Sequence, residues 1–188
     1  MVREIEAASA ACSTVGVTPR AMNPRAASIR ACRVRALDLI RPKWMDDEPV
    51  WWQGARFQVK GRAEETGGML GLAEADFWAG MGPPLHVHHR EDEAFYILEG
   101  QIRFQRGDED FVGGAGDFVF APREVPHRFK VLEGGARALV LMTPAGLEHM
   151  FLEGGIRAAS APPPEHYDMG QVAELASKYG WDIIGPAL

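Results

Sequence analysis

The chain has 188 residues, of which 46% are hydrophobic and 24% charged, a composition typical of a folded domain rather than a disordered segment. Residues 42–188 hold 13 basic and 23 acidic side chains, whereas a nucleic-acid partner needs a basic face. No apolar run approaches the roughly 18 residues that cross a bilayer. We therefore expect neither a nucleic-acid partner nor a membrane partner.

Residues 1–42 are predicted to form a poorly ordered N-terminal extension. They are rich in Ala, Ser and Arg and lack the apolar stretch of roughly 7–15 residues found in secretory signals. Pro19 and Pro24 would interrupt the long amphipathic helix of an organelle transit peptide. Both cysteines, Cys12 and Cys32, lie in this segment and make no disulfide framework, so we expect a reducing, cytoplasmic location.

Residues 43–160 are predicted to form an all-β domain. Apolar and polar residues alternate in the segments ARFQVK, QIRFQ and HRFKV, which is typical of strands with one buried face. Residues 69–79, 93–98, 117–121 and 136–142 are apolar on both faces. Gly- and Pro-rich turn signals separate these segments, including Gly100 and 134–135. About eight short strands with frequent turns predict a sandwich or a small barrel.

Apolar residues on both strand faces also suggest a second subunit. Such strands need cover from a partner sheet or from another copy of the chain, and we expect a homodimer. Trp44, Trp51 and Trp52 precede the barrel, where they would cover an exposed sheet edge or join the dimer contact.

Residues 161–188 are predicted to form a tail with one short helix. The proline run 162–164 is a stiff, extended segment. Asp168 precedes the helix as its N-cap, with Gln171 as the reciprocal partner, and Gly180 ends it. Another short helix is expected around 147–152, with Leu147, Met150 and Phe151 turned inward.

Three histidines and one glutamate are predicted to meet inside the barrel. His86 and His88 are two residues apart, so they project from the same face of a strand. Glu93 follows after a four-residue connection. His127 comes from a distant strand and shares its face with the apolar Phe129 and Val131, which marks that face as interior.

Burying several titratable groups together is costly unless something compensates their charge. A divalent transition metal does so, because neutral imidazole and ionised carboxylate are good ligands for Fe, Ni, Mn, Co, Cu and Zn. One alternative is ordinary surface or core histidines beside a solvated glutamate. The other is the same fold with a metal that is only structural or is absent. His149 and His166 are expected in ordinary packing or surface positions.

The neighbours of the histidines are expected to lie outside this cluster. His89 should point to the opposite face of the strand from His88. Glu91 and Asp92 are predicted to lie in a solvated turn. Phe95, Phe104, Phe120 and Phe129 are predicted to share the inner face as a substrate pocket, which favours an apolar, planar substrate.

The spacing of these residues resembles the cupin superfamily. The pattern Gly80-x5-His86-x-His88-x4-Glu93-x6-Gly100 reproduces the first cupin motif, and Gly116-x5-Pro122 followed by Val125-Pro126-His127 reproduces most of the second. The second motif departs from the family at Glu124, where glycine is usual, and at Val131, where asparagine is usual. With glutamate there, we expect the turn to avoid positive φ.

The flanking segments GPPLHVHHREDEAFYILEG, GDFVFAPREVPH and ELASKYGWDIIGP resemble those of single-domain bacterial cupins described as quercetin dioxygenase-like. The resemblance covers residues 50–188. It implies a double-stranded β-helix, also called a cupin or jelly-roll barrel, and a divalent metal held by His86, His88, Glu93 and His127.

This resemblance also implies a metal-dependent dioxygenase that acts on a small aromatic or enolisable substrate, with Glu93 as a catalytic base. Two alternatives stay open at this point. One is a non-redox isomerase, cyclase or decarboxylase that uses the metal as a Lewis acid. The other is a cupin that binds a small molecule without turnover.

Overall fold

The computed structural model describes residues 48–158 and 164–188. Several predictions fall on residues outside these ranges. They concern the N-terminal extension 1–42, both cysteines, Trp44 and most of the proline run 162–164. Among the described residues, no helix is both long enough and apolar enough to cross a membrane.

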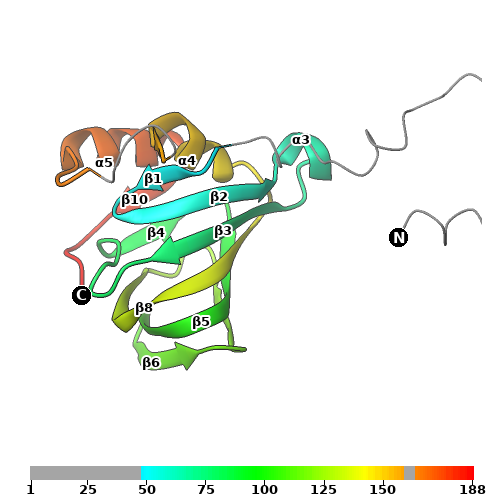
Figure 1. The fold of residues 1–188 in the computed structure, drawn as a ribbon. Helices are drawn as coiled ribbons and strands as arrows, with labels where there is room; N and C mark the ends of the chain where they lie inside the picture. Colours follow the sequence, from blue (N-terminus) through cyan, green and yellow to red (C-terminus); the bar gives the residue numbers. More distant parts are fainter. Residues whose placement is uncertain (1–47, 159–163) are drawn as a thin grey trace, which may run out of the picture. The chain divides into compact units, whose positions relative to one another are not determined.

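Ten strands and three short helices make up the described part of the chain (Figure 1). The strands are β1 (Val50–Trp52), β2 (Ala55–Gly61), β3 (Gly71–Phe77), β4 (His86–His88), β5 (Asp92–Arg106), β6 (Glu109–Gly114), β7 (Phe118–Ala121), β8 (His127–Thr143), β9 (Ile156–Arg157) and β10 (Trp181–Ile183). The helices are α3 (Ala63–Thr66), α4 (Glu148–Gly154) and α5 (Met169–Lys178).

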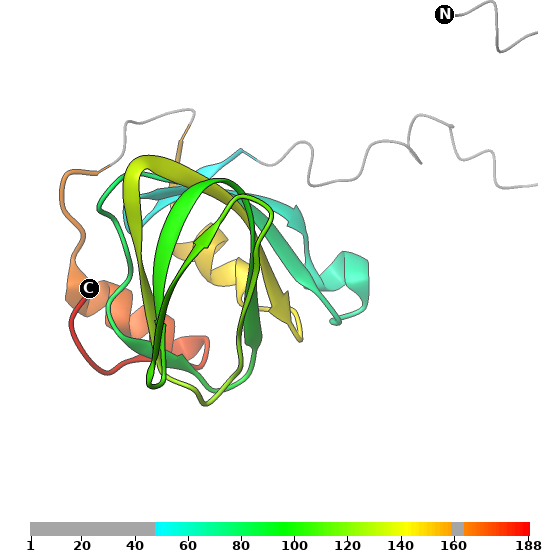
Figure 2. The same cartoon turned by 90° about the horizontal axis from the view of Figure 1, so that it is seen from below.

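All strand pairs are antiparallel. The two long strands, β5 and β8, pair with each other and so join the two sets of strands in the sheet. One path runs in the order β10-β4-β8-β3-β2-β1-β9, while β5 pairs with β6, β7 and β8. Because β5 and β8 pair along most of their length, the sheet curls around a common interior (Figure 2). This mostly antiparallel arrangement is the predicted jelly-roll barrel.

Gly100 and residues 134–135 were predicted to be turns, but they lie within the two long strands. Both β5 and β8 continue through these glycines as bent strands, with register shifts around Ile97–Glu99 and Gly100–Ile102. Gly100 has φ of 81°, and a Cβ there would collide with the carbonyl oxygen of Gly135. These glycines therefore allow two backbones to bend together, as bulges do in barrels.

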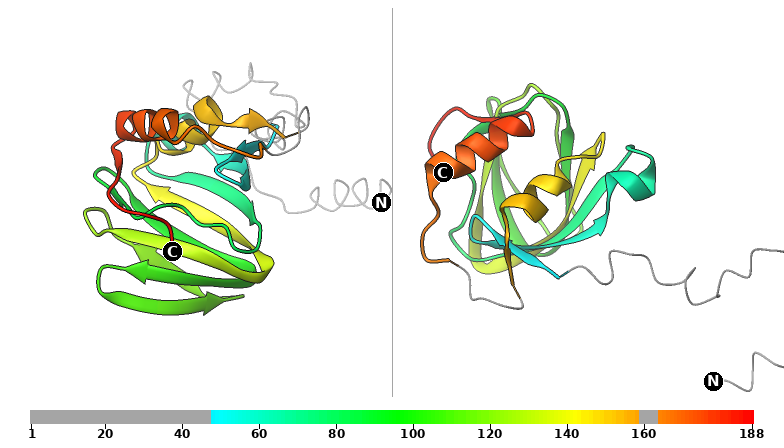
Figure 3. Two further views of the ribbon diagram at one scale, coloured as in Figure 1. Left: turned by 90° about the vertical axis from the view of Figure 1, so that its left-hand side faces the viewer. Right: turned by 90° about the horizontal axis from the view of Figure 1, so that it is seen from above.

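The predicted helices are present, and they lie at one end of the barrel (Figure 3). Asp168 caps α5 by accepting hydrogen bonds from the backbone N–H groups of Gly170 and Gln171. Leu147, Met150 and Phe151 at α4 are buried, as predicted. Trp51 and Trp52 are also buried in β1, between β2 and β9.

The outer face of the barrel carries uncovered apolar side chains within the described residues. Tyr96 is 41% exposed, and its cross-strand partner Phe118 is 61% exposed. Phe120, on the same strand as Phe118, is also exposed. These residues belong to the strands that the sequence marked as apolar on both faces. The homodimer that would cover them stays a prediction.

Gly82 allows the segment before β4 to lie against β8. A Cβ at this position would overlap the backbone carbonyl of Phe129, and the N–H of Val131 donates to the carbonyl of Met81 at 2.8 Å. This contact brings His86 opposite His127 in the β4–β8 register. A side chain at residue 82 would therefore push β8 away from the segment that leads into β4.

We predict that Gly82→Ala lowers the free energy of unfolding by about 2–3 kcal/mol, because overpacking against backbone cannot be relieved by a side-chain rotation. Gly61→Ala is the matched control, since its Cβ would meet only Leu72 Cβ at an ordinary 3.5 Å. Chemical denaturation of both variants measures the difference. Equal stability of the two variants would contradict the close approach at Gly82.

Candidate metal centre

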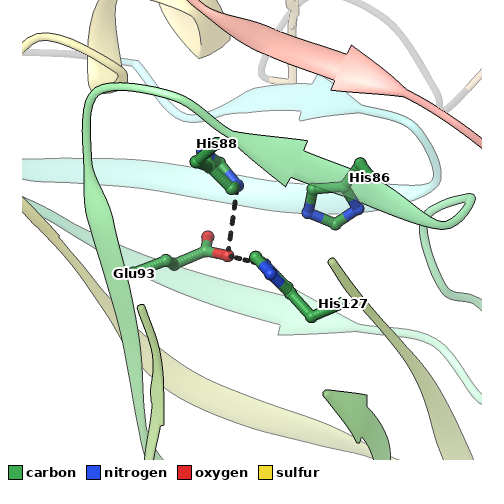
Figure 4. Close-up of side chains that lie close together, drawn as sticks. All are labelled: His86, His88, Glu93 and His127. Carbon is green, nitrogen blue, oxygen red and sulfur yellow. Dashed lines mark hydrogen bonds and ion pairs between the residues drawn. The ribbon is translucent and has the colours of Figure 1, made fainter. Parts of the chain in front are cut away.

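Three strands place the four predicted ligands around one point (Figure 4). His86 and His88 are the first and last residues of β4, Glu93 is the second residue of β5, and His127 is the first residue of β8. His86 and His127 are cross-strand partners. One ligand atom from each of the four residues lies within 4.8 Å of all the others, so the predicted cluster is assembled.

The four side chains are buried, with relative exposures of 2–7%. The ring centroids of His86 and His127 are 4.4 Å apart, and those of His88 and His127 are 5.2 Å apart. Glu93 Oε2 lies 3.2 Å from His127 Nε2 and 3.6 Å from His88 Nε2. The alternative of solvent-exposed histidines is therefore excluded.

Backbone carbonyls orient two of the imidazoles. His86 Nδ1 donates to the carbonyl of Pro84 at 2.8 Å, and His127 Nδ1 donates to that of Val125 at 3.0 Å. These bonds hold the proton on Nδ1 and leave the Nε2 lone pair available, as is usual for metal-binding histidines. Neither ring nitrogen of His88 has a hydrogen-bond partner among the described residues.

The environment favours the protonation states that metal ligands need. Burial lowers the pKa of His86 well below its ordinary value, and the neighbouring His127 and His88 lower it further. Burial also lowers the pKa of His88 to about 4, although Glu93 opposes this shift. Both imidazoles are therefore neutral at pH 7.

Glu93 stays ionised despite its position. Burial alone would raise the pKa of its carboxyl group, but the bond to His127 and the nearby His88 outweigh it and lower the pKa. In the neutral His127 tautomer that keeps its proton on Nδ1, this hydrogen bond cannot form, because the Nε2 lone pair then faces the carboxylate oxygen at 3.2 Å. Two acceptors this close need a proton or a cation between them, and the donor set fits a divalent transition metal.

The C-terminal strand β10 supports this cluster, a feature that the sequence reading missed. Trp181 pairs with His88 across the β4–β10 ladder. Its ring stacks on His88 at 5.9 Å and meets His86 edge-on at 4.8 Å between centroids. The period-two pattern Trp181–Asp182–Ile183 after a glycine was the available signal, but three residues are too few to identify a strand.

An apolar cavity opens beside the cluster. Its water-accessible volume is about 50 Å³, and His86, His88 and Glu93 contribute to its wall. Phe95 and Phe129 line it, as predicted, together with residues of α4 and β10.

Two members of the predicted phenylalanine pocket lie elsewhere. Phe104 is buried but does not line the cavity, because it packs behind Phe95 and Phe129 at centroid distances of 5.3 and 5.9 Å. Phe120 lies on the outer face and is 41% exposed. The register explains this outcome: Glu93 pairs with Ala121, so Ala121 faces inward and the adjacent Phe120 faces outward.

The residues around the cluster differ partly from expectation. His89 points outward, as predicted, and bonds Glu124 and Asp182. Asp92 accepts hydrogen bonds from Arg123. Glu91 was predicted to be solvated, but it is buried, and burial raises its pKa to about 7. Glu124 was expected to avoid positive φ but adopts 63°, so this turn keeps the geometry usually given to glycine.

The remaining histidines play no part in the cluster. His149 forms ion pairs with Glu64 and Glu148 at 3.2 and 3.7 Å. His166 is exposed. Both placements agree with the expected packing and surface positions.

Comparisons with known proteins identify the central part of the chain. Residues 74–144 match the cupin domain family. An uncharacterised protein of Methanocaldococcus jannaschii is 36% identical over 59 residues, which are 31% of this chain and 47% of that protein. The match thus spans about half of the relative's length.

One solved structure shows a related fold at low identity, and a second gives a weaker match. KdgF from Halomonas sp. aligns with a TM-score of 0.50 and 19% identity, covering 57% of this chain and 94% of that one. An RmlC-like cupin from Shewanella frigidimarina gives a TM-score of 0.49 and 24% identity, covering 56% and 90%. The finer resemblance to quercetin dioxygenase-like proteins stays a prediction. Residues 74–144 are therefore similar to the cupin domain family, and the chain around them shares the barrel fold.

Proposed function

We propose that this protein is a metal-dependent dioxygenase acting on a small, largely apolar aromatic or enolisable substrate. The observation that carries the proposal is the apolar cavity whose wall includes His86, His88 and Glu93. A substrate in this cavity would reach the ligand cluster directly while displacing water from it.

His86, His88, Glu93 and His127 would hold one divalent ion. The chemistry that such an ion supplies when bound is polarisation of a substrate oxygen and, for a redox-active metal, electron transfer involving O₂. Three imidazoles and one carboxylate leave room for further ligands around a six-coordinate ion. The metal's identity does not follow from this donor set.

The side chains of the protein would position the substrate, exclude water from it and accept its proton. Phe95 and Phe129 offer flat apolar surfaces to a planar substrate beside the ligands. Glu93 Oε2 is the carboxylate oxygen nearest His88 and His127, and we propose that it accepts a substrate hydroxyl proton. Burial favours the protonated form of Glu93, whereas its contacts with His127 and His88 lower the pKa. Proton transfer to Glu93 would therefore require these contacts to loosen.

Metal content tests the first part of this proposal. We expect protein purified without added metal to contain about one equivalent of a transition metal, and His127→Ala to reduce the bound metal at least ~10-fold, because one of four ligands is lost. Elemental analysis of the folded proteins measures both, with the exposed His166→Ala as the matched control. Full metal content in the His127 variant would contradict the proposed site.

Acid sensitivity of the metal-free protein tests the buried histidines. The lowered pKa of His88 means that the unfolded chain binds the extra proton first, so stability falls as pH drops from 6.5 towards 4. The raised pKa of Glu91 acts in the opposite direction, since its protonation at lower pH favours the folded state. In the native sequence, Glu91 offsets only part of the loss, because the lowered pKa of His86 acts in the same direction as that of His88.

Glu91→Gln removes the opposing contribution. In this background, we predict that the free energy of unfolding falls by about 2–3 kcal/mol between pH 6.5 and 4.5, from roughly two pKa units of His88. Denaturant titrations with chelator present at several pH values measure the slope. A Glu91→Gln profile that is flat, or that rises on acidification, would contradict the burial of neutral histidines.

Oxygen uptake tests the reaction class. With flavonols and β-diketones as candidate substrates, we expect substrate-dependent O₂ consumption, and we expect Glu93→Gln to lower turnover about 10²–10⁴-fold while retaining much of the metal. Equal turnover in this variant would remove Glu93 from the chemistry. Conversion that persists under strict anaerobiosis would instead favour a Lewis-acid isomerase, cyclase or decarboxylase, and binding without any conversion would favour a non-catalytic cupin.

A further inference from the structure

One outer face of the barrel carries a continuous group of apolar side chains. Strands β7, β5, β8 and β3 pair in this order, and every second residue of each strand points outward. The register aligns the outward residues in rows, so that Phe118, Tyr96 and Leu139 are successive cross-strand partners. Six apolar side chains form what we call the outer apolar face: Leu72, Tyr96, Phe118, Phe120, Leu139 and Leu141.

The outer apolar face is open to solvent among the described residues. Phe118 is 61% exposed, Tyr96 and Phe120 are each 41% exposed, and the three leucines are half-buried. Single exposed apolar residues are common, but a contiguous group of them marks an interaction surface. None of the six residues lines the cavity beside the ligand cluster, so this surface is separate from the candidate metal centre.

The charged side chains around this face are balanced in sign. Eight of them form ion pairs with one another, with nitrogen–oxygen distances of at most 3.6 Å: Asp92 with Arg123, Asp76 with Arg56, Glu74 with Lys60 and Arg137, and Glu99 with Arg137. Four carboxylates thus meet four cationic groups. The border of the outer apolar face has no net charge.

This balance favours a second copy of the chain as the partner. Residues 42–188 hold 13 basic and 23 acidic side chains, so two copies repel each other over much of their surface. At the outer apolar face this repulsion is absent, because the border charges are already paired. An acidic or basic partner would find no excess of opposite charge there. A face that is neutral and apolar can instead meet its own copy across a two-fold axis.

The tryptophans before the barrel were the other predicted place for a dimer contact. Trp51 and Trp52 are only 8% and 5% exposed, and they pack within their own sheet between β2 and β9. Side chains that are already buried in one copy have little surface left to offer to another. Of the predicted dimer contacts that lie in the described residues, the outer apolar face is the one with exposed side chains.

We propose that the outer apolar face is the interface of a homodimer. Two copies meet face to face, with the aromatic side chains of β5 and β7 in the centre and the ion pairs at the rim. An aromatic, charge-free centre inside a polar rim is the usual composition of a protein interface. The contact uses no residue of the candidate site, so the proposal does not depend on the proposed function.

Sedimentation of the full-length protein at micromolar concentrations tests this interface. We expect the native protein to have twice the mass of one chain. Phe118→Glu should weaken dimerisation at least ~100-fold, because each copy then buries an unpaired charge in the contact. Tyr96→Ser adds no charge and should weaken it about 10-fold through the lost aromatic contact. Both residues are exposed within one chain, so we expect both variants to fold, as circular dichroism would show.

Val112→Glu is the matched control, because Val112 is 50% exposed on β6, outside the outer apolar face. It should change the dissociation constant less than about 2-fold. A native protein that sediments as a monomer, or only together with a different protein, would overturn the proposal. So would a dimer that neither Phe118→Glu nor Tyr96→Ser weakens, or one that Val112→Glu weakens equally. Metal content and oxygen uptake do not enter this measurement, so a failure of the proposed function leaves its result intact.

Discussion

The central constraint in this structure is the burial of three imidazoles and one carboxylate close together in a barrel lined mainly by apolar residues. Neutral histidines avoid the cost of buried positive charge, but their free nitrogen lone pairs then face one another and face Glu93. The 3.2 Å approach of Glu93 Oε2 to His127 Nε2 is favourable only with a proton or a cation between them. A divalent metal would satisfy all four groups at once, and we therefore propose that the cluster is a ligand set and not a polar core.

The fold holds this cluster from three sides. The bent strands β5 and β8 each contribute a ligand near one end, and their glycines allow the sheet to curl around the interior. Gly82 brings the segment before β4 against β8. The tail then returns as β10 to pair with β4, so the three-residue strand that carries two ligands is held on both edges. Trp181 from this tail forms part of the cavity wall beside the cluster, so the C-terminal region contributes to the candidate site.

Periodicity was sufficient to predict which strand face carries each of the three histidines, because alternation fixes the relative direction of side chains two residues apart. The position of Glu93 followed instead from the short connection after His88. The shared face of His86 and His88, and that of His127 and Phe129, could be predicted without knowing which strands pair. The orientation of 117–121 could not be predicted this way, since both of its faces are apolar; only the pairing of Glu93 with Ala121 shows that Phe120 points outward. The docking of Trp181 depends on contacts with His86 and His88, which lie more than 90 residues earlier in the sequence. Local patterns encode neither these contacts nor the burial of Glu91.

X-ray absorption at the edge of the metal that copurifies tests the central claim most directly. The account predicts a single metal with nitrogen and oxygen neighbours at about 2.0–2.2 Å, multiple scattering from three imidazoles, and no sulfur in the first shell. Loss of one imidazole's scattering in His86→Ala would assign the signal to this cluster. A sulfur-containing shell, or a spectrum without histidine scattering, would contradict the convergence of the four side chains on one ion.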